Sequence, residues 1–257
     1  MPVRVRYYTD PACPASWAAE PNWRRLSVEF GADLSITYVM GGLAREYEAP
    51  HEGRLLEWLG WADRSGMPLD PRLWAEAPLR SSYPACMAVK AAAEQGPDAA
   101  RRYLRAVREG LFCFRRRLDA KEALVEEGRG AGLDVARFRT DLDSHAIVEA
   151  FAADLELTRS AGLALPAICF GDEQPVSGEA GYRDWRAAAL AAGAQPASDG
   201  PPDVLAALAR FGRMATRELE AVCDLPGPRA EAELWRLATE WRVKPVRVLT
   251  GVLWELA

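Results

Sequence analysis

The sequence predicts an α/β protein in which a small sheet is interrupted by a helical insertion and followed by a small C-terminal unit. Strand and helix patterns alternate at the start of the chain, helical patterns fill about residues 43–162, and strand patterns then return. Residues 194–202 (Ala-Gln-Pro-Ala-Ser-Asp-Gly-Pro-Pro) have the composition of a linker. We therefore expect an α/β domain over residues 1–193 and a separate unit over residues 203–257.

The first strand leads into a helix that begins at a cysteine. Residues 3–7 alternate β-favouring and polar side chains, which predicts a strand that ends before Pro11. Cys13 then stands at the predicted helix start, with Pro14 in the first turn. We expect this helix to continue past Pro21 with a bend.

The second strand completes a crossover unit. Gly31 is a natural stop for the first helix, and a strand is predicted over residues 34–40. Strand, helix and strand in this order form the smallest unit that joins two parallel strands. The sheet is therefore expected to begin with a parallel pair.

The insertion begins irregularly, with several prolines, and then becomes helical. Helices are predicted over residues 55–65, 82–93, 98–114, 120–130, 134–143 and 144–160. Ser82 is the candidate N-cap of the second of these helices. Cys86 and Cys113 fall inside the insertion, and no sequence pattern brings either thiol close to Cys13.

The sheet resumes with a proline at a strand start. Leu165-Pro166 precedes a predicted strand over residues 167–170, and a turn then leads to residues 174–178, which suits a hairpin. A proline cannot donate a ladder hydrogen bond, so it belongs at a strand start, where a cis peptide bond is often used. A helix is predicted over residues 182–192.

The C-terminal unit has the outline of a winged helix-turn-helix. Helices are predicted over residues 203–210, 216–223 and 229–242, with strands over residues 245–249 and 252–256. Thr216 is the candidate N-cap of the second helix. Eight basic residues are balanced by eight acidic ones after residue 202, so the unit lacks the positive charge that supplies most non-specific DNA affinity. We expect a packing or protein-binding role and no DNA binding.

Composition excludes several other classes of function. The formal charge is −5, so no electrostatic attraction to nucleic acid or to an anionic membrane is expected. The beginning of the chain shows no secretion signal, and no apolar run is long enough to cross a bilayer, which predicts a cytoplasmic protein. Five scattered cysteines and two histidines predict neither a disulfide framework nor a metal site.

Cys13 is the candidate reactive group. Unpaired N–H groups and the positive end of the helix dipole favour a thiolate at a helix start, and a thiolate is the nucleophile in disulfide exchange. Ser16 occupies the position where a second cysteine would resolve a mixed disulfide. The site could therefore form a mixed disulfide but not release it internally. The alternative is that Cys13 is an inert thiol on a binding scaffold.

These motifs together resemble the DsbA-like branch of the thioredoxin superfamily, over roughly residues 3–193. The resemblance rests on Asp-Pro-Ala-Cys-Pro-Ala-Ser-Trp at residues 10–17, the helical insertion, Leu165-Pro166 and the closing hairpin. The branch includes FrnE-type dithiol oxidoreductases, 2-hydroxychromene-2-carboxylate isomerases and kappa-class glutathione transferases. It also includes YjbH-type protease adaptors, which carry an Asp-Pro-x-Cys site followed by Trp and a Glu-Pro step, here Trp17 and Glu20-Pro21.

The resemblance implies a role for each matching residue. Cys13 corresponds to the nucleophilic cysteine, and Ser16 replaces the resolving one. Pro166 corresponds to the cis-proline that faces the cysteine, and the backbone of Leu165 to the group that pairs with a bound peptide or thiol. Pro14 and Trp17 are expected to line the same substrate groove.

Two functions follow from the resemblance. The first is a DsbA-family thiol-disulfide oxidoreductase-like protein with one active-site cysteine, acting by mixed-disulfide or glutathione-linked exchange on protein thiols or disulfides. Glutathione would then be a co-substrate, and no bound cofactor is expected. The alternative is a non-catalytic adaptor, similar to YjbH, that binds a client protein. The sequence leaves open whether the protein is an enzyme.

Overall fold

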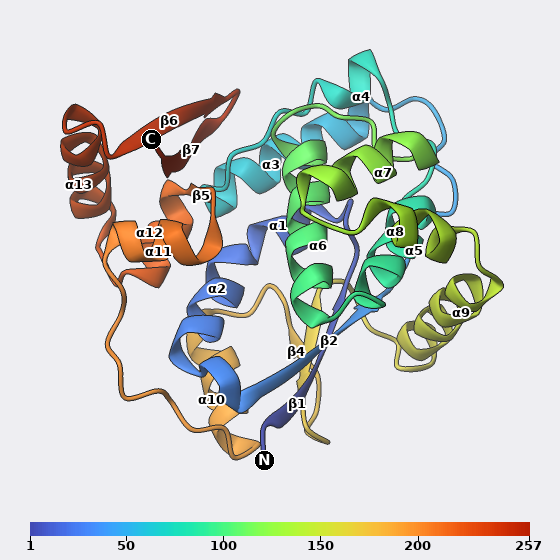
Figure 1. The fold of residues 1–257 in the computed structure, drawn as a ribbon, viewed down its shortest axis with the longest axis horizontal. Helices are drawn as coiled ribbons and strands as arrows, with labels where there is room; N and C mark the ends of the chain where they lie inside the picture. The colour runs from blue at the N-terminus through green and yellow to red at the C-terminus, as the bar shows by residue number, and fades with distance from the viewer.

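The computed structural model describes residues 1–257, and its sheet confirms the expected α/β order (Figure 1). The strands are β1 (Val3–Thr9), β2 (Leu34–Met40), β3 (Ala167–Phe170) and β4 (Val176–Ser177). Their order across the sheet is β2-β1-β3-β4. β1 and β2 are parallel, and β3 and β4 form the expected antiparallel hairpin beside β1.

Three helices complete this part of the chain: α1 (Pro14–Ala18), α2 (Glu20–Glu29) and α10 (Tyr182–Ala191). The expected bend near Pro21 is a break at Ala19, which separates α1 from α2. A short 3-10 turn (Gly31–Asp33) then leads into β2. Buried aromatic side chains join α2 and α10 to the sheet, because Tyr7 stacks on Trp23 with ring centroids 4.7 Å apart and meets Trp185 edge-on.

The insertion consists of helices, as expected. They are α3 (Glu52–Ser65), α4 (Leu73–Glu76), α5 (Tyr83–Ala93), α6 (Pro97–Phe112), α7 (Lys121–Gly130), α8 (Val135–Leu142) and α9 (His145–Ser160). Ser82 is the N-cap residue of α5, as expected, but its side chain makes no capping hydrogen bond. The Ser82 hydroxyl donates instead to the carboxylate of Asp10, at 2.8 Å.

The C-terminal unit contains α11 (Val204–Phe211), β5 (Met214–Ala215), α12 (Thr216–Val222), α13 (Gly227–Thr239), β6 (Val243–Val248) and β7 (Gly251–Leu256). Its sheet has the order β5-β7-β6. β5 has only two residues, which is too short for a sequence pattern. The expected cap at Thr216 is wrong, because Ala215 is the N-cap and the Thr216 hydroxyl accepts from Trp254 Nε1 at 2.9 Å. The likeness to a winged helix stays a prediction.

The C-terminal unit has a hydrophobic core of its own but is joined to the rest through buried contacts. Ala215, Val248 and Leu253 belong to the core of the insertion, although they lie beyond the linker. The Thr250 hydroxyl accepts from the backbone N–H of Leu69 at 2.7 Å. The linker passes along the left of Figure 1 between α10 and α11. The Arg24 guanidinium of α2 also pairs with Glu218 of α12 at 2.7 Å, so the unit is docked on both the α/β part and the insertion.

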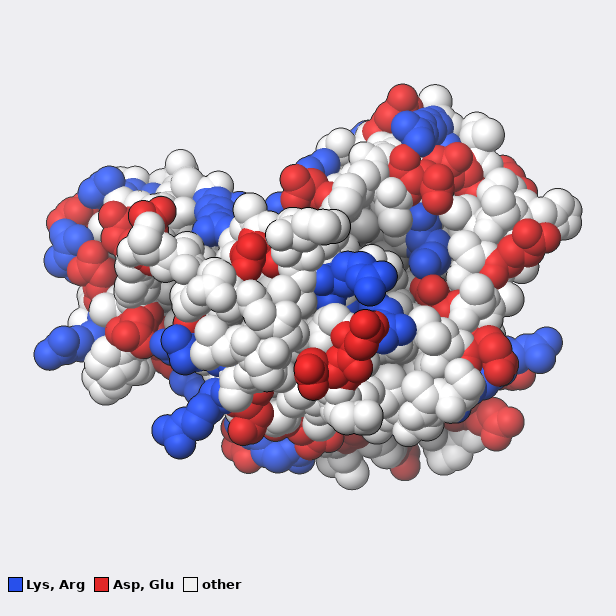
Figure 2. All heavy atoms as spheres, turned by 90° about the horizontal axis from the view of Figure 1, so that it is seen from below, with Lys and Arg blue, Asp and Glu red and all other residues white.

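The face seen in Figure 2 has no broad field of one charge. Figure 2 shows basic and acidic side chains interspersed over one face, with a basic cluster at its centre bordered by carboxylates. None of the helices combines the length and the apolar content needed to cross a bilayer.

Candidate functional site

Cys13 lies between the end of β1 and the start of α1, as expected. It is the N-cap of α1, and its sulfur accepts a hydrogen bond from the backbone N–H of Ser16 at 3.4 Å. The thiol faces the carbonyl oxygen of Leu165, 3.8 Å from Sγ. Residues far apart in sequence, Cys13, Ser16 and Leu165, are thus brought to one point.

The Leu165-Pro166 peptide bond is cis. Gly178 packs directly on Pro166, and the Gly178 N–H donates to the Pro166 carbonyl at 2.7 Å. A side chain at residue 178 would have its Cβ 2.1 Å from Pro166 Cγ, so this contact requires glycine. Pro166 therefore connects the Cys13 turn to the loop that follows β4.

Cys13 is nearly inaccessible, with 3% of its surface exposed. Burial raises the pKa of its thiol to about 11, and the Ser16 hydroxyl and N–H oppose this rise without reversing it. The expectation of a thiolate is therefore wrong for the isolated chain. The helix start supplies the favourable N–H group, but loss of water around the sulfur outweighs it.

Trp17 does not line a groove, contrary to expectation. It is completely buried, its Nε1 donates to the carbonyl of Pro68 at 3.0 Å, and its ring stacks on Phe112. The Arg105 guanidinium lies 4.5 Å from the centroid of the same ring. Trp17 is therefore a core residue that holds α1 against the insertion. Pro14 is also buried, so it offers no groove wall either.

Ser16 belongs to a buried polar chain that the sequence did not reveal. The Thr9 hydroxyl donates to the Ser16 hydroxyl at 2.9 Å and accepts from the Arg108 guanidinium. Arg108 also pairs with Glu20, and both side chains are almost fully buried. Burial alone would raise the pKa of Glu20, but the charges of Arg108, Arg105 and Arg24 outweigh it, so the pKa is lowered.

Asp10 anchors the turn that carries Cys13. Its carboxylate is fully buried and accepts hydrogen bonds from the N–H groups of Ala12 and Leu43, at 2.7 and 2.6 Å, and from Ser82. Burial raises the pKa of Asp10 in spite of these bonds. The Cys86 thiol donates to the same carboxylate at 3.2 Å, so Cys86 supports Asp10 and is a free thiol, like the other four cysteines.

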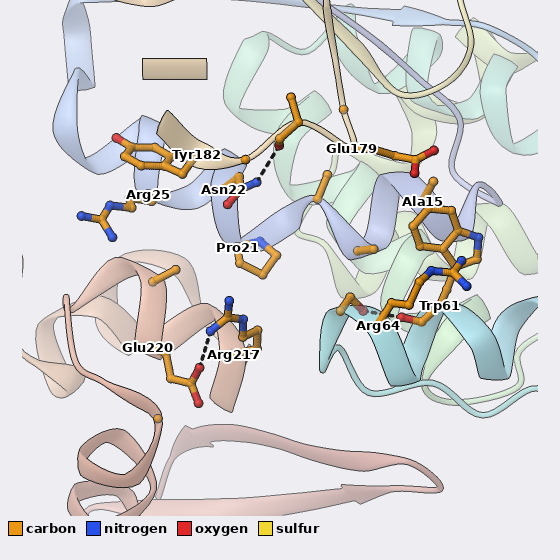
Figure 3. A pocket seen from close by; sticks show the side chains of 18 of the residues that line it. Ala15, Pro21, Asn22, Arg25, Trp61, Arg64, Glu179, Tyr182, Arg217 and Glu220 are labelled. Atoms are coloured by element: carbon orange, nitrogen blue, oxygen red, sulfur yellow. Dashed lines mark hydrogen bonds and ion pairs between the residues drawn. The ribbon is translucent and has the colours of Figure 1, made fainter. Parts of the chain in front are cut away.

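A cavity of about 780 Å³ opens beside this site (Figure 3). Its walls come from α1 and α2, from α3, from the loop after β4 and from α12. The lining residues labelled in Figure 3 include Ala15, Asn22, Trp61, Arg64, Glu179 and Arg217. None of the sequence-predicted site residues lines it, but Ala15 follows Pro14, and Gly178 rests on Pro166.

The charges around this cavity are partly paired. Arg217 pairs with Glu220 at 2.7 Å, and the Asn22 amide donates to the Ala180 carbonyl at 3.4 Å. The Arg64 guanidinium lies over the Trp61 ring, 4.3 Å from its centroid. Such a lining of small, aromatic and mixed-charge side chains suits a polypeptide better than a metal. No group of His, Cys, Asp and Glu side chains is arranged to hold a metal ion.

Comparison with known proteins gives matches along nearly the whole chain. The model of the family described as Thioredoxin matches residues 7–181. The ClpXP adapter protein SpxH of Halalkalibacterium halodurans is 30% identical, over 99% of this chain and 89% of the relative. The protein of the same name from Bacillus subtilis is 27% identical, with the same coverage of both chains.

Two solved structures share the fold of the first domain. The cytosolic disulfide reductase DsbM from Pseudomonas aeruginosa superposes with a TM-score of 0.60 at 21% identity, covering 72% of this chain and 95% of its own. A probable DsbA oxidoreductase from Streptomyces coelicolor superposes with a TM-score of 0.61 at 19% identity, covering 79% and 94%. At these identities the similarity concerns the fold.

Proposed function

Because this chain belongs to the thioredoxin superfamily, in its DsbA-like branch, we propose that it is a protein-binding adaptor that presents a client protein to a ClpXP-type protease. The observation that carries the proposal is the sealed thiol: Cys13 is 3% exposed and has a pKa raised to about 11. A scaffold of this kind can keep its shape while the cysteine does no chemistry. The expected location remains the cytoplasm.

The relatives support the same proposal. The proteins named ClpXP adapter SpxH match 99% of this chain, so the match includes the C-terminal unit that lies beyond the Thioredoxin match. An adaptor has to contact two partners, and a chain with a cavity between three docked parts offers more than one surface for them. The cavity beside Ala15 and Arg64 is our candidate for one of these contacts.

The monothiol oxidoreductase is the second function that the sequence indicated. It requires the Cys13 sulfur to reach a disulfide or a glutathionyl group, with Leu165 and Pro166 holding the partner. In the structure the Cys13 thiol donates to the Leu165 carbonyl. This backbone group is the one expected to bind such a partner, so it is already occupied. We therefore rank this function below the adaptor, with glutathione as its expected co-substrate.

Reconstituted proteolysis tests the proposal. Purified ClpX and ClpP from the source organism are incubated with its soluble proteome, with and without the chain, and protein half-lives are measured by quantitative mass spectrometry. We expect the chain to accelerate the loss of a small set of proteins, and Cys13→Ala to retain this effect. Ala18→Trp, which fills the cavity, is expected to weaken it.

The matched control is Ala153→Trp on the exposed side of α9, which should act like the unchanged chain. If no protein is lost faster with the chain, the adaptor proposal fails. If the faster loss of proteins requires an intact Cys13 thiol and a reductant, the monothiol oxidoreductase replaces the non-catalytic adaptor as the proposed function.

A further inference from the structure

β2 lies at the edge of the four-stranded sheet and pairs on one side only, with β1. The Gly41 N–H, directly after β2, donates to the Thr9 carbonyl on β1. Because backbone groups alternate sides along a strand, the odd-numbered residues of β2 face β1 and the even-numbered ones face outward. The Met40 N–H fits this pattern, since it points away from β1 and donates to Asp154 of α9.

Two outward-facing residues of β2 have no partner for their backbone groups. The N–H and C=O groups of Ile36 and Tyr38 make no hydrogen bond to backbone or side chain outside the sheet, and no strand lies next to them. Unpaired strand groups are a template for another extended chain, which gains main-chain hydrogen bonds by adding to the edge.

A cavity of about 560 Å³ runs along this edge. Leu34, Ile36 and Tyr38 form one side of it. The end of α2 with the following 3-10 turn, the start of α6 (Pro97 and its neighbours) and the end of α11 (Phe211) form the others. The cavity therefore borders the two residues whose backbone groups have no partner. It is bounded by helices from the insertion and from the C-terminal unit.

The sequence of β2 lacks the protective residue types that another free edge of this chain carries. β6 is the edge strand of the C-terminal sheet, and it contains Lys244, Pro245 and Arg247, residue types that prevent strand addition. β2 (Leu-Ser-Ile-Thr-Tyr-Val-Met) has no proline, no charge and no bulge. Protection of one edge and not the other is consistent with use of the unprotected one.

We propose that the free edge of β2 receives an extended segment of the client protein as an additional strand. The client as the source of this segment rests on the proposed function. We do not expect a second copy of the sheet at this edge, because Asp154 of α9 occupies the Met40 end and residues of α6 and α11 line the cavity beside the remainder. Residues 34–38 span roughly 17 Å at about 3.3 Å per residue.

The charges beside this edge restrict the segment further. The cavity lining contains Arg101, which pairs with Asp98 at 3.3 Å, and Arg210, which donates to the Ser27 carbonyl at 2.9 Å and has no paired carboxylate. A segment of β-branched or small residues without positive charge, or with one carboxylate at its end, is complementary to this lining.

Ile36→Pro in the full-length chain tests the role of the edge. Proline at this position removes an outward N–H but leaves the ladder to β1, whose donors are on the neighbouring residues. The matched control is Ile36→Val, which keeps the N–H and the β-branched side chain. The probe is a phage-displayed library of random twelve-residue peptides, and synthetic copies of enriched peptides are then titrated by calorimetry. We expect Ile36→Pro to weaken binding at least about tenfold and Ile36→Val to stay within about twofold.

Amide hydrogen exchange of the unchanged chain provides a readout that does not depend on folding of a variant. The amides of Ile36 and Tyr38 should exchange quickly in the free chain and be protected when an enriched peptide is bound. Failure to enrich any peptide overturns the inference. Protection confined to other places, such as the loop after β4, also overturns it.

The two proposals can fail separately. If ClpXP-dependent loss of proteins is not accelerated but peptides protect Ile36 and Tyr38, the edge site stands and the adaptor proposal falls. If the Ile36→Pro chain accelerates the loss of the same proteins at the normal rate, the adaptor proposal stands and the β2 edge is not its client site.

Discussion

Arg105 on α6 forms a bidentate ion pair with the carboxylate of Glu218 on α12. Its two terminal nitrogens donate to the two carboxylate oxygens at 2.8 and 2.9 Å. The same guanidinium contacts Glu20 of α2 at 3.2 Å and lies over the ring of Trp17. One side chain of the insertion therefore joins the α/β part to the C-terminal unit. The walls of the cavity beside Ala15 are held together by this contact, because α12 forms one of them.

Loss of this ion pair is expected to destabilise the whole chain. Arg105→Ala removes the two-pronged partner of the completely buried Glu218 carboxylate, which keeps its ion pair with Arg24 at 2.7 Å. Because breaking a buried pair outright costs about 3–5 kcal/mol, we expect a loss below that range but above about 1 kcal/mol. Urea unfolding followed by circular dichroism measures the change. Arg129→Ala is the control, since its pair with Glu126 is exposed and should contribute less than about 1 kcal/mol. Equal effects of the two substitutions would contradict a structural role for Arg105.

Acid is expected to destabilise the fold because it protonates Glu20. Its folded pKa is lowered, so the stability it contributes is complete above its unfolded pKa of about 4.3 and is lost as pH falls through the lower folded value. Protonation leaves Arg24, Arg105 and Arg108 with fewer buried counter-charges. The measurement is the free energy of unfolding against pH, in the unchanged chain and in Glu20→Gln. The pH dependence below pH 4.3 should be shallower in Glu20→Gln, and identical curves would rule out this source.

The thiol of Cys13 is expected to be slow to react. With a pKa of about 11, roughly one thiol in three thousand is ionised at pH 7.5, against about one in ten for a free cysteine. Alkylation of Cys13 by iodoacetamide, followed by mass spectrometry of the peptide, should be at least about a hundredfold slower than in the chain unfolded in urea. A native rate close to the unfolded rate would show that the site opens.

Gly178→Ala is expected to disturb the Pro166 contact. The added Cβ would lie 2.1 Å from Pro166 Cγ and 2.7 Å from its carbonyl oxygen, and such overpacking costs about 1–3 kcal/mol. Gly130→Ala at the end of α7 is the control, because nothing lies within 4 Å of the new Cβ. That change should leave stability unchanged or raise it by up to about 1 kcal/mol. The midpoint of thermal unfolding distinguishes the two.

DNA is expected not to bind the C-terminal unit. Eight basic and eight acidic residues beyond the linker cancel, and α13 has Arg236 paired with both Glu233 and Glu240. A mobility-shift assay with the whole chain at low salt should show no complex below about 10 µM protein. A shift that weakens steeply with salt would restore the DNA-binding interpretation.

Local patterns determined the order of the elements. The alternation in residues 34–40, the helix start at Cys13 and the proline at residue 166 are properties of short stretches, and short stretches decide where strands and helices begin. The structure confirms these elements almost to the residue. The sequence by itself thus determined the sheet, its helical insertion and the place of Cys13 at the start of α1.

Tertiary packing decided what the cysteine and the tryptophan can do. Cys13 is sealed and Trp17 is in the core because Leu165, Pro68 and Phe112, all distant in sequence, close around them. Burial, and with it the pKa of a thiol or carboxylate, depends on contacts between segments that no local pattern encodes. The cavity beside Ala15 and the cavity beside β2 were decided in the same way, because their walls come from all three parts of the chain.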